Sequence, residues 1–256
     1  MQPPEMHSTS RKRIDNMQRR ADRESGLLED PEESYDRLPP GQSLVKQGFP
    51  VLDLGVHPVL ELDAWSLVIS IPGQPDFSYD WKGWGTLPTA LYTHDIHCVT
   101  AWSVFDANFQ GVGTRELLKR SPVGDDVTHV LVHGADGYSA NLTLTDFLAA
   151  GALLATHLNG KPLTVSHGGP LRLVIPHLYF WKSPKWVTRI EFLSGDQPGF
   201  WEQRGYHNRG NPWRQERYGP KQATKPIRPE TILIKAVLPP PKGWERFKRW
   251  YAEHLG

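Results

Sequence analysis

The chain has 256 residues, of which 38% are hydrophobic and 22% charged, and its formal net charge is +1. This composition is typical of a globular protein with a substantial core and gives no general electrostatic reason to bind nucleic acid or an anionic membrane. A single cysteine, Cys98, excludes an intramolecular disulfide and favours the cytosol. The most apolar helical stretch, residues 147–158, has about half of the roughly 20 residues that span a bilayer, so no membrane span is expected.

Residues 1–45 are expected to form a flexible polar tail. Large apolar side chains are few there, and a basic run in residues 11–23 is followed by an acidic run in residues 24–36. Arg19-Arg20 is not followed by the apolar segment that an export signal needs, which again favours a cytoplasmic protein.

The next part of the chain, residues 46–218, is expected to form one main domain. Strands are predicted where branched and aromatic residues gather, at residues 65–71, 127–132, 171–175 and 186–193. Helices are fewer: one is predicted at residues 114–119, and a second would be capped by Thr145-Asp146 and run through Leu153. Strands and helices do not alternate regularly, so the fold class predicted is α+β.

Residues 219–256 are predicted to be a C-terminal extension. It begins with a polar, proline-broken segment, and residues 231–238 favour a strand. A last, amphipathic helix is expected from Lys242, with Trp244, Phe247 and Trp250 on one face. That face would pack on the main domain or bind a partner.

The densest group of reactive side chains surrounds Cys98. A lone cysteine is most often a small buried hydrophobe, but two histidines and a carboxylate lie within four residues of this one. The thiolate could be a nucleophile, could bind a redox metal, or could join His94 and His97 around zinc, with His129 and His133 as further ligands. No C-x-x-C pair or H-E-x-x-H helix supports the zinc interpretation.

A second group occupies residues 165–186. Arg172 lies on a predicted strand that follows Gly168-Gly169-Pro170, and Lys182, Ser183 and Lys185 come after it. Glycines allow close backbone approach to a ligand, and the cations suit a phosphate or a pterin. The same glycines also form an ordinary turn.

Four ordered segments are HCVTAWS (97–103), DGYS (136–139), HGGPLRLVIP (167–176) and KSPKW (182–186), and a motif at residues 205–218 contains Gly-Tyr-His, Pro-Trp and Glu-Arg-Tyr. Together they resemble the oxidoreductase molybdopterin-binding domain shared by sulfite oxidases, assimilatory nitrate reductases and the bacterial protein-methionine-sulfoxide reductase catalytic subunit. The resemblance covers roughly residues 48–218 and is nearest to the haem-free bacterial branch. It implies a mixed β-sheet fold of the sulfite-oxidase type and a molybdenum-molybdopterin cofactor.

The resemblance also implies residue roles. Cys98 would supply the protein sulfur to molybdenum, and the pterin dithiolene would supply two more sulfurs. Tyr138 matches a tyrosine that faces the metal centre and donates a hydrogen bond near the substrate. His97 departs from the family, because the methionine-sulfoxide reductase pattern has arginine before the cysteine; it could relay a proton near neutral pH or only form a hydrogen bond near the cofactor. The residues implied to hold the pterin and its phosphate are His167, Arg172, Ser183, Pro184 and Lys185.

The predicted function is a mononuclear molybdenum oxidoreductase that transfers an oxygen atom, with two electrons, to or from a small sulfite-like, sulfoxide-like or N-oxide-like substrate. Residues 100–103 lack the arginine that sulfite oxidases place after the cysteine, which implies an uncharged pocket wall. With one cysteine there is no C-x-x-C-H haem site, so a separate electron-transfer partner is expected: a cytochrome, a flavoprotein or a quinone-linked protein. The alternatives are a zinc-dependent hydrolase and a non-catalytic cofactor-binding module.

Overall fold

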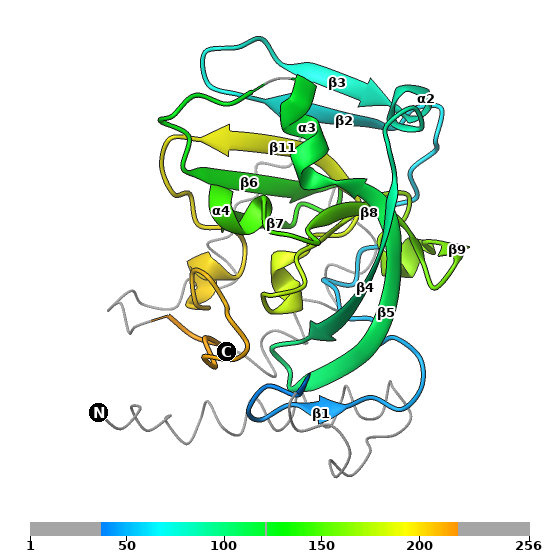
Figure 1. The fold of residues 1–256 in the computed structure, drawn as a ribbon, viewed down its shortest axis with the longest axis vertical. Helices are drawn as coiled ribbons and strands as arrows, with labels where there is room; N and C mark the ends of the chain where they lie inside the picture. Colours follow the sequence, from blue (N-terminus) through cyan, green and yellow to red (C-terminus); the bar gives the residue numbers. More distant parts are fainter. Residues whose placement is uncertain (1–36, 121, 220–256) are drawn as a thin grey trace.

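The computed structural model describes residues 37–120 and 122–219 (Figure 1). The first 36 residues of the expected tail lie outside these ranges. The strand and the amphipathic helix expected beyond residue 230 lie outside them as well.

One of two β-sheets has six strands, in the order β1-β5-β8-β10, with β4 paired to β5 and β9 to β8. β1 runs parallel to β5, and the other pairs are antiparallel. The strands of this sheet are β1 (Ser43–Leu44), β4 (Ala90–His97), β5 (Trp102–Gly113), β8 (Leu153–Leu158), β9 (Lys161–Pro162) and β10 (Arg172–Val174).

The second sheet has five strands, in the order β3-β2-β11-β6-β7. β11 runs parallel to β2 and antiparallel to β6, so both sheets are mixed. The strands are β2 (Ser66–Ser70), β3 (Phe77–Asp80), β6 (His129–Gly134), β7 (Ser139–Thr143) and β11 (Val187–Leu193).

The helices are short and connect strands. They are α2 (Trp81–Trp84), α3 (Thr114–Arg120), α4 (Leu144–Phe147) and the 3-10 helices η2 (Val165–His167), η3 (Phe180–Lys182) and η4 (Glu202–Arg204). The four strands and the first helix predicted from sequence correspond to β2, β6, β10, β11 and α3. Among residues 37–120 and 122–219, no helix is both long and apolar enough to cross a bilayer.

The predicted helix capped by Thr145-Asp146 is wrong. Thr143 is the cap, since its side chain accepts a hydrogen bond from the backbone of Asp146, and α4 ends after four residues. Gly151, at a φ of +81°, turns the chain into β8. A short apolar run fits either a helix or a doubly buried strand, and here pairing with β5 and β10 decides for the strand.

Residues 43–44, which fall inside the expected tail of residues 1–45, form β1. β1 pairs with Trp102 and Ser103 at the start of β5, and Gln42 beside it is buried. Backbone and amide hydrogen bonds hold this segment together with the buried side chain of Val45, and these contacts are with residues far away in the sequence.

The six-stranded sheet is buried on both faces. On β8, Leu154 packs into the core shared with the second sheet, while Leu153 and Ala155 pack into a separate aromatic cluster. Alternation along a strand sends neighbours to opposite faces, and β10 repeats the pattern with Leu173 and Val174. Figure 1 shows the long, curved β5 running from this core to β1. The aromatic cluster contains Cys98.

We predict that Gly111→Ala destabilises the fold. A Cβ at Gly111 would lie 2.1 Å from the carbonyl oxygen of Leu154, at an irregularity in the β5–β8 ladder. Overpacking of this kind costs about 1 to 3 kcal/mol of unfolding free energy, measured by urea denaturation. Gly113→Ala is the matched control on the same strand, because a Cβ at Gly113 would meet no atom within 4 Å. Equal losses in both variants would contradict this packing.

Candidate functional site

Cys98 lies in a tight turn between β4 and β5. The backbone N–H of Cys98 donates to Trp102 O at 2.8 Å, and that of Ala101 donates to Cys98 O at 3.0 Å. Ala101 has a φ of 74°, in the left-handed region. The turn therefore closes a hairpin and holds Cys98 at the end of the six-stranded sheet.

Two distant segments hold this turn in place. From the N-terminal side, Gln42 Nε2 donates to Cys98 O at 3.0 Å and Ser43 N donates to Ala101 O at 2.8 Å. From the C-terminal side, the buried guanidinium of Arg217 donates to Val99 O. Arg217 thereby brings a positive charge to the turn from 118 residues away in the sequence, whereas residues 100–103 carry no charge of their own.

The Cys98 thiol is buried and accepts a hydrogen bond of 3.2 Å from the Thr100 hydroxyl. Burial raises the pKa of Cys98, while the Thr100 hydrogen bond and the positive charge of Arg217 act to lower it. The thiol therefore stays protonated near neutral pH unless a cation takes the place of its proton. A buried sulfur with two such partners is suited to a soft metal.

His97 is buried beside Cys98, and its Nδ1 forms a hydrogen bond of 2.8 Å with Ser103 Oγ. Burial lowers the pKa of His97 to about 4. Burial thus favours the neutral imidazole, and the proton relay expected of His97 stays a prediction. Its ring lies 6.3 Å, centroid to centroid, from that of Trp213, which is 49% exposed.

The residues predicted to hold the pterin come together on the face of the six-stranded sheet that also carries the aromatic cluster of Cys98. Arg172 Nη1 donates to His167 O at 2.9 Å, and Nη2 donates to Ser183 O at 3.1 Å. The Ser183 hydroxyl accepts from Ile175 N at 2.9 Å, and Pro184 O accepts from Leu173 N. These contacts join η2, β10 and the segment after η3 into one cradle.

Lys185 completes the cradle. Its Nζ donates to Ser166 O at 2.9 Å and pairs with Asp53 Oδ2 at 3.0 Å. Gly168 has a φ of 99°, and a Cβ there would lie 2.8 Å from the Lys185 side chain. Only glycine permits this close approach. Asp53, which sequence reasoning did not identify, also contacts His57 at 2.7 Å.

Phe49 links the Cys98 turn to the cradle and was likewise not predicted. Its ring centroid lies 5.9 Å from that of Trp102 and 5.8 Å from that of His167. Its carbonyl accepts from His167 Nε2 at 3.2 Å. The two predicted groups are therefore parts of one site, although no pattern in the sequence pairs Phe49 with either.

The site suits an anionic pterin cofactor. Arg172 and Arg217 are buried, and within the part of the chain described here neither forms an ion pair with a carboxylate. Burial lowers the pKa of Arg172 to about 9. Buried cations of this kind need a counter-charge. Trp102 Nε1 is also buried without a hydrogen-bond partner among these residues. A phosphate and polar heterocycle would satisfy such groups.

Tyr138 does not lie in the aromatic cluster of Cys98. It packs with Phe200 in a smaller cluster, and its hydroxyl donates to Trp181 O at 2.6 Å. Burial raises the pKa of Tyr138, so the phenol stays protonated. A different tyrosine, Tyr206, shares the cluster of Cys98 and was missed, although it belongs to the Gly-Tyr-His motif.

The alternative zinc ligands are not brought together. His94 Nε2 donates to Gly151 O at 3.0 Å, whereas His97 bonds to Ser103. His129 and His133 lie on β6, in the other sheet. Across residues 37–120 and 122–219, no three His, Cys, Asp or Glu side chains are grouped to hold a metal ion. The geometry gives the zinc hydrolase no ligand set there.

Asp136, near the cradle, should make the stability of the fold depend on pH. Its partly buried carboxylate accepts from Tyr138 N at 3.1 Å, and burial raises its pKa from 3.8 to about 6. Because the folded pKa exceeds the unfolded one, the contribution of Asp136 to stability is greatest below pH 3.8 and is lost as the pH rises through 6. Asp136→Asn should therefore stabilise the fold at pH 8, by at most about 3 kcal/mol, and not near pH 4.

Urea denaturation at both pH values measures this difference. Asp63→Asn, which removes the same charge at an exposed position, is the control against which the gain is measured. A gain for Asp136→Asn that is the same at both pH values would contradict the assignment.

Comparison with known proteins identifies the family. A model of the oxidoreductase molybdopterin binding domain matches residues 54–201. The uncharacterized oxidoreductase YuiH of Bacillus subtilis (strain 168) is 42% identical over 183 residues, which cover 71% of this chain and 92% of that protein. The mitochondrial sulfite oxidase of Drosophila melanogaster is 30% identical over 115 residues, covering 41% of this chain and 20% of that protein.

The sulfane dehydrogenase SoxCD from Paracoccus pantotrophus has a similar fold, with a TM-score of 0.53 at 16% identity over 73% of this chain and 57% of that chain. The α+β fold with mixed sheets and the molybdenum-molybdopterin cofactor are thereby confirmed. The matched residues include Cys98 and the whole cradle. The chain belongs to the oxidoreductase molybdopterin-binding domain family and is a molybdopterin-dependent oxidoreductase of the sulfite-oxidase type.

Proposed function

We propose that the chain is a mononuclear molybdenum oxidoreductase in which Cys98 is the protein ligand of the metal, and that it transfers an oxygen atom to or from a small substrate. The observation that carries the proposal is the buried Cys98 thiol in a turn fixed from both sides, on the same face of the sheet as the cradle. When bound, the cofactor supplies a metal that cycles by two electrons and exchanges oxygen with the substrate.

The roles of the chain's own residues follow from their contacts. Arg172 and Lys185 bind the anionic end of the cofactor, and the backbone around Ser183 and Pro184 fixes their positions. His167 bridges the cradle to Phe49. Lys185 would then exchange its contact with Asp53, at least in part, for a phosphate oxygen.

Neutral His97 and protonated Tyr138 act through hydrogen bonds. His97 forms a hydrogen bond with Ser103 beside the turn, and burial, which lowers its pKa to about 4, favours the neutral ring. Tyr138 supports the wall of the site through Trp181 O in this structure, and its predicted contact with substrate remains a proposal.

The substrate proposed is a small sulfite-like, sulfoxide-like or N-oxide-like molecule. Relatives support the sulfite-like and sulfoxide-like members of this range, because they include sulfite oxidases and a protein-methionine-sulfoxide reductase catalytic subunit of Xanthomonas campestris, 30% identical over 153 residues that cover 52% of this chain and 46% of that protein. The exposed ring of Trp213, which contacts His97 next to Cys98, supports electron exchange with a separate partner at that surface. The single cysteine supports a cytosolic location.

Metal and pterin content test this proposal. Protein purified from a molybdenum-replete host should contain both, by elemental analysis and by fluorescence of the oxidised pterin. Cys98→Ser should lose molybdenum by at least about tenfold, because loss of a ligand exceeds the effect of an outer contact.

His94→Gln is the control. Among the described residues, the His94 side chain bonds to Gly151 O and stacks on Tyr92, away from the cradle, so molybdenum content should stay at the wild-type level. Wild-type protein with stoichiometric zinc and neither molybdenum nor pterin, and loss of that zinc in His94→Gln, would overturn the proposal in favour of the hydrolase.

A further inference from the structure

We propose that Arg217 is the positioning residue of the metal-ligand turn: it fixes residues 98–101 in their liganding conformation and places a positive charge beside the molybdenum. This inference rests on the proposed function, since it assumes that Cys98 binds the metal. Three observations carry it: the contacts of Arg217, its placement by a folded loop, and the lack of an ion pair to it among the residues that the structure describes.

The first observation is the set of contacts. Arg217 is 6% exposed, and its Nη1 donates to Val99 O, one residue beyond the ligand. Nη2 lies 3.5 Å from Gly41 O, at the limit of a hydrogen bond, and the guanidinium carbon lies 5.0 Å from the Tyr179 ring centroid. One planar group therefore joins the ligand turn to the segment before β1, which itself holds Cys98 O through Gln42.

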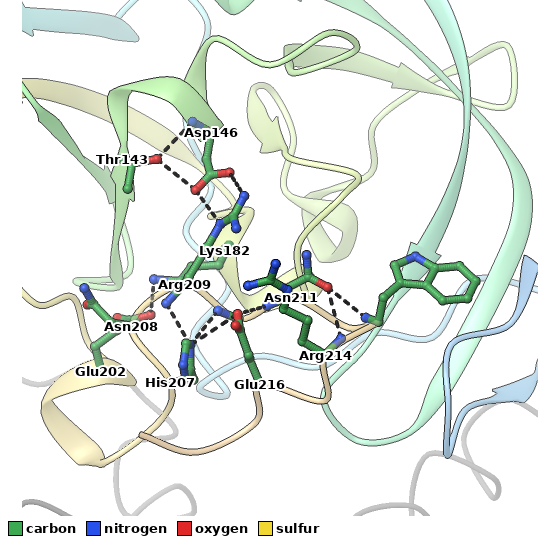
Figure 2. Close-up of polar contacts among 12 residues, drawn as sticks. Thr143, Asp146, Lys182, Glu202, His207, Asn208, Arg209, Asn211, Arg214 and Glu216 are labelled. Atoms are coloured by element: carbon green, nitrogen blue, oxygen red, sulfur yellow. Dashed lines mark hydrogen bonds and ion pairs between the residues drawn. The ribbon is translucent and has the colours of Figure 1, made fainter. Parts of the chain in front are cut away.

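The second observation is that the loop carrying Arg217 is itself fixed (Figure 2). Glu216 Oε2 accepts from Asn211 N at 2.9 Å and lies 3.5 Å from His207 Nδ1. Asn211 Oδ1 accepts from the backbone N–H groups of Trp213 and Arg214. Residues 207–216 thus form a folded loop immediately before Arg217.

This loop is anchored to α4. Arg209 makes two hydrogen bonds to Asp146, from Nε at 3.1 Å and from Nη2 at 2.9 Å, and Asp146 also accepts from the Thr143 hydroxyl (Figure 2). Gly210 O accepts from Tyr179 N at 2.7 Å. Two hydrogen bonds to one carboxylate fix the orientation of the Arg209 guanidinium as well as its distance from Asp146. The backbone of Arg217 is therefore positioned by contacts that lie outside the Cys98 turn.

The third observation is charge. Within residues 37–120 and 122–219, no carboxylate forms an ion pair with Arg217, although Glu216 is adjacent in sequence and is turned towards His207 and Asn211. A positive charge in a buried environment acts strongly on a neighbouring anionic sulfur. Lysine could keep that charge, but its single ammonium lacks the planar fork that reaches two separate carbonyls.

Three variants of the full-length holoprotein test the inference: Arg217→Lys, Arg217→Gln and, as matched control, Arg214→Gln. Arg214 lies three residues away on the same loop with an exposed side chain, so its replacement removes the same charge. Hydrogen exchange of the peptide that covers residues 98–103 reports on the turn. The Mo(VI/V) midpoint potential, from a titration followed by electron paramagnetic resonance, reports on the charge.

Arg217→Gln should exchange faster in that peptide and shift the midpoint to lower potential, because a positive charge that favours the reduced metal is lost. Arg217→Lys should exchange faster but keep a midpoint near that of wild type. Arg214→Gln should match wild type in both. Wild-type exchange in Arg217→Lys would overturn the positioning role, and an unchanged midpoint in Arg217→Gln would overturn the charge role.

The two proposals fail in different ways. Wild-type protein without molybdenum would refute the proposed function. The exchange measurement would still decide whether Arg217 holds the turn, and if Arg217→Gln does not fold, the Lys variant decides it alone.

Discussion

The site depends on how the carbonyl groups of a four-residue turn are satisfied. Cys98 O, Val99 O and Ala101 O accept from Gln42, Arg217 and Ser43, so both ends of the described chain meet at the same hairpin. Buried carbonyls without partners are costly, so the turn and these segments stabilise one another. The direction of the Cys98 side chain is thus set by contacts far from it in sequence.

The Cys98 turn joins two strands of the six-stranded sheet, β4 and β5, so the sheet determines where the turn lies. Because both of its faces are buried, one face packs on the second sheet and the other carries the cradle and the aromatic cluster. Arg172 and Val174 point away from the shared core, whereas Leu173 between them points into it. A scaffold built this way can hold a large cofactor against rigid strands, with Phe49 filling the space between ligand turn and cradle.

Local signals were sufficient to predict much of this arrangement. Strand patterns predicted β2, β6, β10 and β11, and the family resemblance of the ordered motifs implied that Cys98 and Arg172 share one site. The remaining features depend on tertiary contacts. The start of β8 was predicted as helix because an apolar run has no decisive period, and the burial that lowers the pKa of His97 leaves no mark on the sequence around it. Arg217 belongs to the Glu-Arg-Tyr motif that was part of the family resemblance. Its contact with Val99 could not be predicted, because the two residues are far apart in the sequence.

The central claim is that Cys98 provides a sulfur ligand to molybdenum, and X-ray absorption at the molybdenum K-edge measures it directly. The account predicts that the sulfur shell of the wild-type protein contains one more sulfur than that of whatever molybdenum-loaded fraction of Cys98→Ser can be purified. The Thr100→Val variant, which removes the hydrogen bond to Sγ but keeps the thiol, should retain the wild-type number. A sulfur shell that is identical in wild type and Cys98→Ser would contradict the account.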